Sequence, residues 1–148
     1  MDKTSVKFTK LDERAVAPTY GTPYAAGADL RAICDENVVI NPHETVLMHT
    51  GIATEIPDGL VGLIYARSGL ASKRGLAPAN CVGVIDSDYR GEIMVALHNY
   101  SNTSQTIENG ERIAQLVIAP YIAAEFVETE SLTDTDRGAG GFGSTGRK

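Results

Sequence analysis

Short apolar runs, each closed by turn residues, are the feature that most constrains the fold of this sequence. LVGLIYA, GEIMVALHNY and ERIAQLVIAP are rich in valine and isoleucine, several runs alternate apolar with polar residues, and Pro, Gly or Asn residues stand between them. Two-residue alternation predicts strands, and strands at such close spacing are typical of an antiparallel barrel or sandwich. We therefore predict an all-β fold, and we find no internal repeat of the solenoid kind.

One segment departs from the strand pattern. SGLASKRG, residues 68–75, is predicted to form a short helix, because Ser68 can cap its start with its hydroxyl and Gly75 can end it with a positive φ. Polar and acidic residues without apolar periodicity follow residue 128, and glycines follow them. We therefore expect one barrel domain over residues 1–128 and a linker with a mobile C-terminal arm over residues 129–148.

The length and charge of the chain narrow the classes of partner. A chain of 148 residues suits one domain, and a net charge of −6 argues against a broad duplex-binding surface, which needs basic residues that replace counterions. The first residues lack the apolar run of an export signal, and no stretch reaches the roughly 20 apolar residues of a membrane span. We expect no nucleic-acid polymer as partner, no membrane association and a cytoplasmic location, with the nucleus or a virus-infected host cell as alternatives.

The cysteines and histidines show no pattern of metal ligands. Cys34 and Cys81 lie in apolar, strand-like contexts, so we expect both to be small buried residues outside any disulfide or metal site. His43, His49 and His98 lack the spacing of ligands, and we assign them no role.

The segment ARSGLASKRGL, residues 66–76, combines donors suited to an anion with a predicted helix start. The first N–H groups of a helix are unpaired and lie at the positive end of its dipole, so they attract phosphate. Arg67 and the Ser68 hydroxyl add donors, and Gly69 allows close approach of the backbone. The alternative is a capped surface helix without a ligand, and the local sequence does not decide between the two.

Two aspartates stand next to apolar residues. Asp86 follows GVI at the end of a predicted strand, where a carboxylate that faces a cleft could take a proton from water. The alternative is a hairpin turn in which aspartates hydrogen-bond the backbone. Asp29 lies within the alternating stretch AGADLRA, and a buried carboxylate there must be paired or functional. A salt bridge to an arginine is the structural alternative for Asp29.

The chain ends in RGAGGFGSTGRK, residues 137–148, in which five of twelve residues are glycine. Glycine keeps such a segment from ordering by itself. Arg137 and Phe142 nevertheless stand in it, and a polar tail has no obvious need of an aromatic ring. The combination raises the question of what the ring and the guanidinium contact.

Taken together, five segments resemble the ordered motifs of the trimeric dUTPases, the deoxyuridine triphosphate nucleotidohydrolases. The resemblance covers residues 5–146, and its one small departure is Ala66, where the family often has proline. It implies a jelly-roll-like β-barrel with one short helix and a flexible C-terminal arm, assembled as a homotrimer whose active sites are shared between subunits. The five segments are, in chain order, AGADLRA, ARSGLASKRGL, GVIDSDYRGE, GERIAQLVIAP and RGAGGFGSTG.

The same resemblance implies a dUTP diphosphatase, which hydrolyses dUTP to dUMP and pyrophosphate by water attack on the α-phosphorus. That activity limits uracil incorporation into DNA and supplies dUMP for thymidylate synthesis. Asp86 is then expected to be the general base, and Tyr89 is expected to pack against the deoxyribose. The residues expected to read the uracil edge are Asn80, Gly83, Val84 and Ile85.

The remaining motifs imply contacts with the phosphates and with Mg²⁺, the expected cofactor. Because Mg²⁺ would be coordinated chiefly by the three phosphates, no protein residue is expected as a direct ligand, and Asp29 would act through bound water. Arg137 is expected to neutralise charge on the phosphates, and Phe142 to stack on the uracil when the arm closes. With Asp86, Asp29 and Arg137 make up the expected catalytic set. The expected phosphate-side residues are Arg67, Ser68, Gly69, Gln115, Gly143, Ser144 and Thr145.

Two other functions stay open. A dCTP deaminase shares this fold, but such enzymes use a glutamate for proton transfer and resemble this chain less over residues 83–92. A trimeric binding module that uses the nucleotide only as a signal would keep the binding motifs without hydrolysis. Ammonia release from dCTP would indicate the first, and dUTP binding without hydrolysis in Mg²⁺ would indicate the second.

Overall fold

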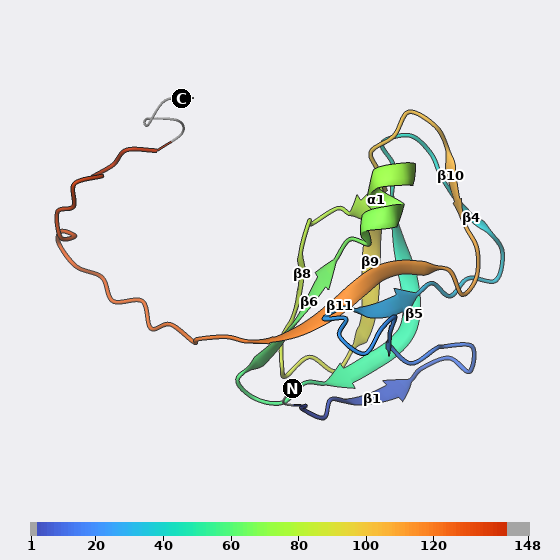
Figure 1. Cartoon of the computed structure of the whole chain (residues 1–148), viewed down its shortest axis with the longest axis horizontal. Helices are drawn as coiled ribbons and strands as arrows, with labels where there is room; N and C mark the ends of the chain where they lie inside the picture. Colours follow the sequence, from blue (N-terminus) through green and yellow to red (C-terminus); the bar gives the residue numbers. More distant parts are fainter. Residues whose placement is uncertain (1–2, 142–148) are drawn as a thin grey trace.

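The computed structural model describes residues 3–141. Figure 1 shows one body of strands with the short helix α1 (Ser68–Arg74) at one end and a C-terminal segment that leaves the body and extends away from it. The predicted all-β fold is confirmed. Within the described residues no helix has the length and apolar character that crossing a bilayer requires.

The strands form two larger sheets and a two-stranded ribbon, and every pairing between neighbours is antiparallel. One sheet has the order β1-β5-β9-β7, the second has the order β2-β3-β11-β6-β8, and β10 pairs with β4. The bounds are β1 Lys7–Lys10, β2 Thr19–Tyr20, β3 Ala28–Arg31, β4 Val38–Ile40, β5 Thr45–Glu55, β6 Leu60–Tyr65, β7 Leu76–Pro78, β8 Gly83–Ile85, β9 Glu92–Asn99, β10 Gln105–Ile107 and β11 Arg112–Pro120.

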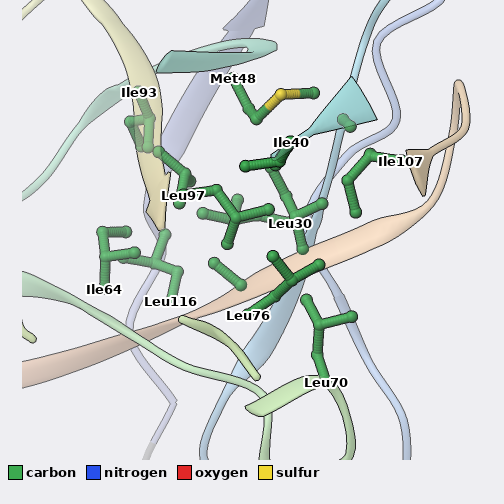
Figure 2. Close-up of a cluster of buried hydrophobic side chains, with 14 residues drawn as sticks. Leu30, Ile40, Met48, Ile64, Leu70, Leu76, Ile93, Leu97, Ile107 and Leu116 are labelled. Atoms are coloured by element: carbon green, nitrogen blue, oxygen red, sulfur yellow. The ribbon is translucent and has the colours of Figure 1, made fainter. Parts of the chain in front are cut away.

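The core lies between the two larger sheets. In β9 the side chains of Ile93, Val95 and Leu97 are buried and their neighbours point outward, as the period of two predicts. Figure 2 shows Leu30 of β3 and Leu116 of β11 in the same apolar cluster as these residues. Full burial of such a side chain contributes about 1.5–3 kcal/mol, so this cluster holds the two sheets together.

The helix forms where the sequence predicts it, but it begins differently. Arg67, with φ −83° and ψ 126°, occupies the position before the first helical residue, and among the described residues no side chain caps the helix. The prediction that Ser68 caps the start is therefore wrong, because Ser68 already lies inside the helix. The predicted end is confirmed: Gly75 has a φ of 66°, and its N–H donates to the carbonyl of Ala71 at 3.0 Å.

Both cysteines are free, but neither is buried. Cys34 is half-buried, and Cys81 is exposed in the turn between β7 and β8 with a φ of 62°. The predicted burial is wrong, because the apolar context of Cys81 belongs to a turn rather than to a strand.

The segment at 121–141 follows the last strand and contains neither helix nor strand. Figure 1 shows it extended away from the sheets. Ile122, Phe126 and Val127 are 92%, 95% and 73% exposed, and within the described part of the chain nothing covers them. Exposed apolar residues close together in sequence are typical of a surface that packs on another molecule. The boundary at residue 128 between barrel and linker stays a prediction.

Candidate active site

Asp29 lies between two arginines. It stands on β3, and its carboxylate oxygen Oδ1 accepts a hydrogen bond from Nε of Arg67 at 2.7 Å, while Oδ2 accepts one from Nη1 of Arg112 at 3.0 Å. The Asp29 side chain is only 13% exposed. The salt bridge to an arginine that the sequence left open as the structural alternative for Asp29 is therefore present, and the second arginine adds positive charge at the start of α1.

Gln115 fixes the segment that leads into α1. Its amide Nε2 donates to the carbonyl of Ala66 at 2.9 Å, and its strand β11 pairs with β3 so that Gln115 stands opposite Asp29. A Cβ placed on Gly27 would lie 2.6 Å from Oε1 of Gln115, so a side chain at position 27 would displace this amide. The structure therefore gathers Arg67, Ser68, Gly69, Asp29 and Gln115 at one place, and the exposed Ser68 and Gly69 are open to a ligand.

Asp86 stands at the start of a tight turn after β8. The N–H of Tyr89 donates to the Asp86 carbonyl at 3.2 Å, and Nη1 of Arg90 donates to the carbonyls of Ser87 and Tyr89 at 2.6 and 3.0 Å. Asp86 is exposed, and among the described residues no donor bonds its carboxylate. The alternative that its side chain merely stabilises a hairpin turn is thus not what the structure shows: backbone groups and Arg90 hold the turn.

A cleft of about 600 Å³ lies beside this turn. Asp86, Ser87 and Asp88 line one part of it, and Val84 and Leu63 form part of its apolar wall. The expected uracil-edge residues stand on the neighbouring backbone: Asn80 is exposed in the turn before β8, and Gly83, Val84 and Ile85 form β8 itself. Nδ2 of Asn80 would lie 3.3 Å from a Cβ on Gly83, which places the amide directly against this strand.

Glu92, at the start of β9, anchors the Asp86 turn to β5. Its Oε1 accepts hydrogen bonds from the N–H groups of Thr50 at 3.1 Å and Gly51 at 2.7 Å, and its Oε2 bonds Nδ1 of His49 at 2.8 Å. Burial opposes the ionisation of Glu92, but the hydrogen bonds from His49, Gly51 and Thr50 outweigh it and lower the pKa of Glu92 below its ordinary value.

The two groups of site residues, the Asp29 group with Arg67, Ser68, Gly69 and Gln115 and the group around Asp86, do not meet within one chain. Asp29 and its partner Gln115 lie on β3 and β11, whereas Asp86 follows β8 at the far edge of the same sheet. Three strand spacings separate β3 from β8, which is about 14 Å. Asp29 and Asp86 are also offset along the direction of the strands. Gln115, which stands opposite Asp29, pairs with Tyr65 on β6, whereas Ile85, the last residue of β8, pairs with Gly62. This offset adds about 10 Å.

Part of the predicted arm lies within the described residues. Arg137 is exposed, and its Nε donates to the carbonyl of Gly140 at 2.9 Å. The segment that carries it runs away from the sheets, so Arg137 meets neither group of residues in this chain. The other residues expected to act in the arm, Phe142, Gly143, Ser144 and Thr145, lie outside the described residues.

The sequence profile of the dUTPase family matches residues 13–146 of this chain. The chain belongs to the dUTPase family. The match includes the Asp29 and Arg67 segment, the Asp86 turn and the C-terminal segment, so all the predicted motifs lie within the family domain.

Individual dUTPases are similar over nearly the full length. A deoxyuridine 5′-triphosphate nucleotidohydrolase from Nautilia profundicola is 54% identical over 142 residues, which cover 96% of this chain and 99% of the relative. One of the same name from Treponema denticola is 50% identical over 139 residues, which cover 94% of this chain and 96% of the relative.

Solved structures of phage dUTPases share the fold. The dUTPase of Staphylococcus bacteriophage 80alpha, solved with dUpNHpp, matches with a TM-score of 0.87 and 31% identity over 97% of this chain and 99% of that chain. A variant of the dUTPase from phage phi11 of S. aureus, described with a structural Mg(II) ion, matches with a TM-score of 0.79 and 27% identity over 88% of this chain and 100% of that chain. The predicted jelly-roll-like β-barrel is confirmed.

The structure also places residues that the sequence does not single out. In the sequence Arg112 is only a polar member of an alternating strand, yet it holds Asp29. Arg90 and Glu92 brace the Asp86 turn. Both follow Asp86 within the motif GVIDSDYRGE, so their presence in a motif is visible in the sequence, but their contacts with carbonyls and with β5 are not.

Proposed function

We propose that this chain hydrolyses dUTP to dUMP and pyrophosphate, with Asp86 as the general base. The observation that carries the proposal is the exposed Asp86 carboxylate, which stands beside a cleft on a braced turn without a bonding partner among the described residues. Membership of the dUTPase family supports the substrate. The physiological consequence would be less uracil in DNA and a supply of dUMP.

The chemical step is a displacement at the α-phosphorus. Asp86 takes a proton from a water molecule, the water oxygen forms a bond with the α-phosphorus, and the bond from that phosphorus to the bridging oxygen breaks. Pyrophosphate leaves with the electron pair of the broken bond. A positioned base of this kind contributes typically about 10²- to 10⁴-fold to the rate.

The turn and β8 would hold the nucleoside. Backbone groups of Gly83, Val84 and Ile85, with the amide of Asn80, offer donors and acceptors in a fixed direction for the uracil edge. Cytosine would present a donor where uracil presents an acceptor, and unpaired buried polar groups reject an analogue strongly. The Tyr89 ring would pack against the deoxyribose and leave no room for a 2′-hydroxyl.

The Asp29 group would hold the triphosphate. Arg67, Ser68 and Gly69 lie at the start of α1, and Asp29 keeps the guanidinium of Arg67 oriented before substrate arrives. Gln115 holds the backbone of this segment and would add a phosphate contact. The positive charge of Arg67 and Arg112 suits a polyanion.

The residues present fit a Mg²⁺ ion that the substrate itself carries. Among the described residues no cluster of three or more His, Cys, Asp or Glu side chains could hold a metal, whereas one carboxylate, Asp29, lies beside the proposed phosphate site. Such an arrangement suits an ion that is coordinated mainly by phosphates and keeps its waters. Asp29 would accept hydrogen bonds from those waters once Arg67 turns to the phosphates. When bound, Mg²⁺ would neutralise phosphate charge.

We propose further that each site is shared between copies of the chain in a homotrimer. The separation of Asp29 from Asp86 across and along one sheet supports this, because one nucleotide would have to span both groups. The exposed Ile122, Phe126 and Val127 support it as well, since a neighbouring copy would cover them. The segment then carries Arg137 and the residues after it, with Phe142 stacked on uracil and Gly143, Ser144 and Thr145 near the phosphates.

One assay tests the proposed function. Incubation of dUTP, UTP and each common deoxynucleoside triphosphate with the protein and Mg²⁺ should release pyrophosphate from dUTP alone. Ammonia from dCTP would instead identify a deaminase. Tight binding of dUTP without pyrophosphate release would identify a binding module. Either result would overturn the proposal.

A further inference from the structure

The position of the Tyr89 ring is set by its own turn. The phenol hydroxyl donates to the backbone carbonyl of Glu92 at 2.9 Å, so the ring folds back over Gly91, the second of the two residues between them. Because the N–H of Tyr89 also donates to the carbonyl of Asp86, the turn that presents the proposed base also presents the ring.

Gly91 leaves no space for a side chain under this ring. A Cβ there would lie 2.4 Å from the Tyr89 hydroxyl oxygen, 2.6 Å from Cζ and 2.9 Å from Cε2. Gly91 is not among the glycines with positive φ, so a left-handed backbone is not the reason for glycine at this position. The three atoms nearest to such a Cβ all belong to Tyr89, so the tyrosine side chain is the first obstacle to a side chain at this position.

We propose that Gly91 is the residue that sets the discrimination between deoxyribose and ribose, because it lets the Tyr89 ring occupy the position that excludes a 2′-hydroxyl. This inference rests on the proposed function, in which Tyr89 packs against the deoxyribose. Gly91 touches no substrate; it is a positioning residue that acts through the ring.

The ring, rather than the backbone, absorbs a side chain at position 91. Tyr89 is 41% exposed, and its ring is held by one hydrogen bond, so rotation about its side-chain torsions moves it into solvent. The backbone on the other side is fixed, since the next residue, Glu92, bonds the N–H groups of Thr50 and Gly51 through its carboxylate. A methyl group at position 91 therefore displaces the phenol and leaves the turn in place.

The test compares Gly91→Ala with the wild type on dUTP and UTP. The ratio of kcat/KM for dUTP to that for UTP should fall by about tenfold or more, because UTP gains the space that the ring vacates. The melting temperature should change little. A matched control is Gly21→Ala: a Cβ placed on Gly21 would have no atom within 4 Å, and Gly21 has no positive φ, so the ratio should stay at the wild-type value.

A second comparison, in a protein that already carries Tyr89→Ala, separates the effect of the displaced ring from any other effect of Gly91→Ala. In Tyr89→Ala the ring is already absent, so adding Gly91→Ala should leave the dUTP-to-UTP ratio unchanged. An equal fall of the ratio in both backgrounds would overturn the proposal, and so would a Gly91→Ala protein that fails to fold or that loses dUTP and UTP activity in equal proportion.

A structural readout distinguishes this inference from the proposed function. A crystal structure of Gly91→Ala should show the Tyr89 hydroxyl displaced from the Glu92 carbonyl, whether or not the protein hydrolyses dUTP. If the wild type releases no pyrophosphate from dUTP, the proposed function fails. If the ring stays in place over an alanine, the inference fails by itself.

Discussion

The two aspartates of the candidate site are held in opposite ways. Asp29 is nearly buried, and hydrogen bonds from Arg67 and Arg112 occupy both of its carboxylate oxygens. Asp86 is exposed on a turn that backbone contacts and Arg90 hold together, and its carboxylate has no bonding partner among the described residues. One region of the molecule uses its carboxylate to order arginines, and the other keeps its carboxylate available to water.

Because of this contrast, substitutions at the two aspartates can separate effects on catalytic rate from effects on folding stability. Removing a paired, largely buried charge leaves its partners uncompensated, so it costs folding free energy. Removing an exposed charge without partners costs little folding free energy, and any loss of rate then reports on catalysis. Variants at the two positions should therefore fall into two classes.

Asp86→Asn should give the largest effect on rate. Asparagine cannot take the proton from water, so kcat should fall by about 10²- to 10⁴-fold. The melting temperature should stay within a few degrees, because the side chain makes no contact that asparagine breaks. Pyrophosphate release and thermal unfolding of the same preparations measure the two quantities. A rate within about threefold of the wild type would remove Asp86 as the general base.

Removal of residues 137–148 should reduce turnover by about 10²-fold, the scale expected when charge stabilisation in the transition state is lost. Its effect on the melting temperature should be small, because the described residues around Arg137 are exposed. Steady-state kinetics on the truncated chain provide the measurement, and Arg137→Gln in the full chain is the matched comparison. Equal turnover in truncated and full-length protein would defeat the role of the arm.

Compared with Asp86→Asn, Asp29→Asn should lower the stability of the fold more and the catalytic rate less. Arg67 and Arg112 would lose their shared carboxylate and repel each other, so the free energy of unfolding should fall by about 1–2 kcal/mol. Urea unfolding measures this, and Asp86→Asn is the control with no such loss. Unchanged stability in Asp29→Asn would mean that the two ion pairs contribute nothing net.

Glu92→Gln should give the smallest effect, visible in its pH dependence. The pKa of Glu92 is lowered on folding, so its ionised form stabilises the protein at pH values above the ordinary value, and that stability is lost as the pH falls through the lowered value. As the pH falls below the ordinary pKa of a glutamate and through the lowered pKa of Glu92, the wild type should therefore lose more stability than Glu92→Gln. The same pH dependence of stability in the two proteins would show that the ionised carboxylate of Glu92 adds nothing to the stability of the fold.

Much of the fold was predictable because its signals are local. The period of two in β9 and the turn residues between the apolar runs identify strands from residues that are close together in the sequence. The end of α1 was predictable for the same reason, since glycine readily adopts the left-handed conformation that Gly75 has there. The start of α1 was mispredicted, because Arg67 rather than Ser68 takes the capping position.

The candidate site was less predictable because its contacts join distant segments. A salt bridge from Asp29 to an arginine was one of two alternatives, but its pairing with Arg112 depends on the register between β3 and β11, which shifts between Arg112 and Ala114. Likewise, the carboxylate of Glu92 meets β5 at residues some forty positions earlier. No local pattern encodes such a register.

The distance between Asp29 and Asp86 within one sheet has a consequence for inheritance. If a site takes its base from one copy and its phosphate-binding group from another, two defective alleles can restore each other. A cell with one gene copy altered at Asp29 and the other at Asp86 would then assemble mixed oligomers in which some sites combine the two intact halves, and it would keep an activity that neither altered protein has by itself.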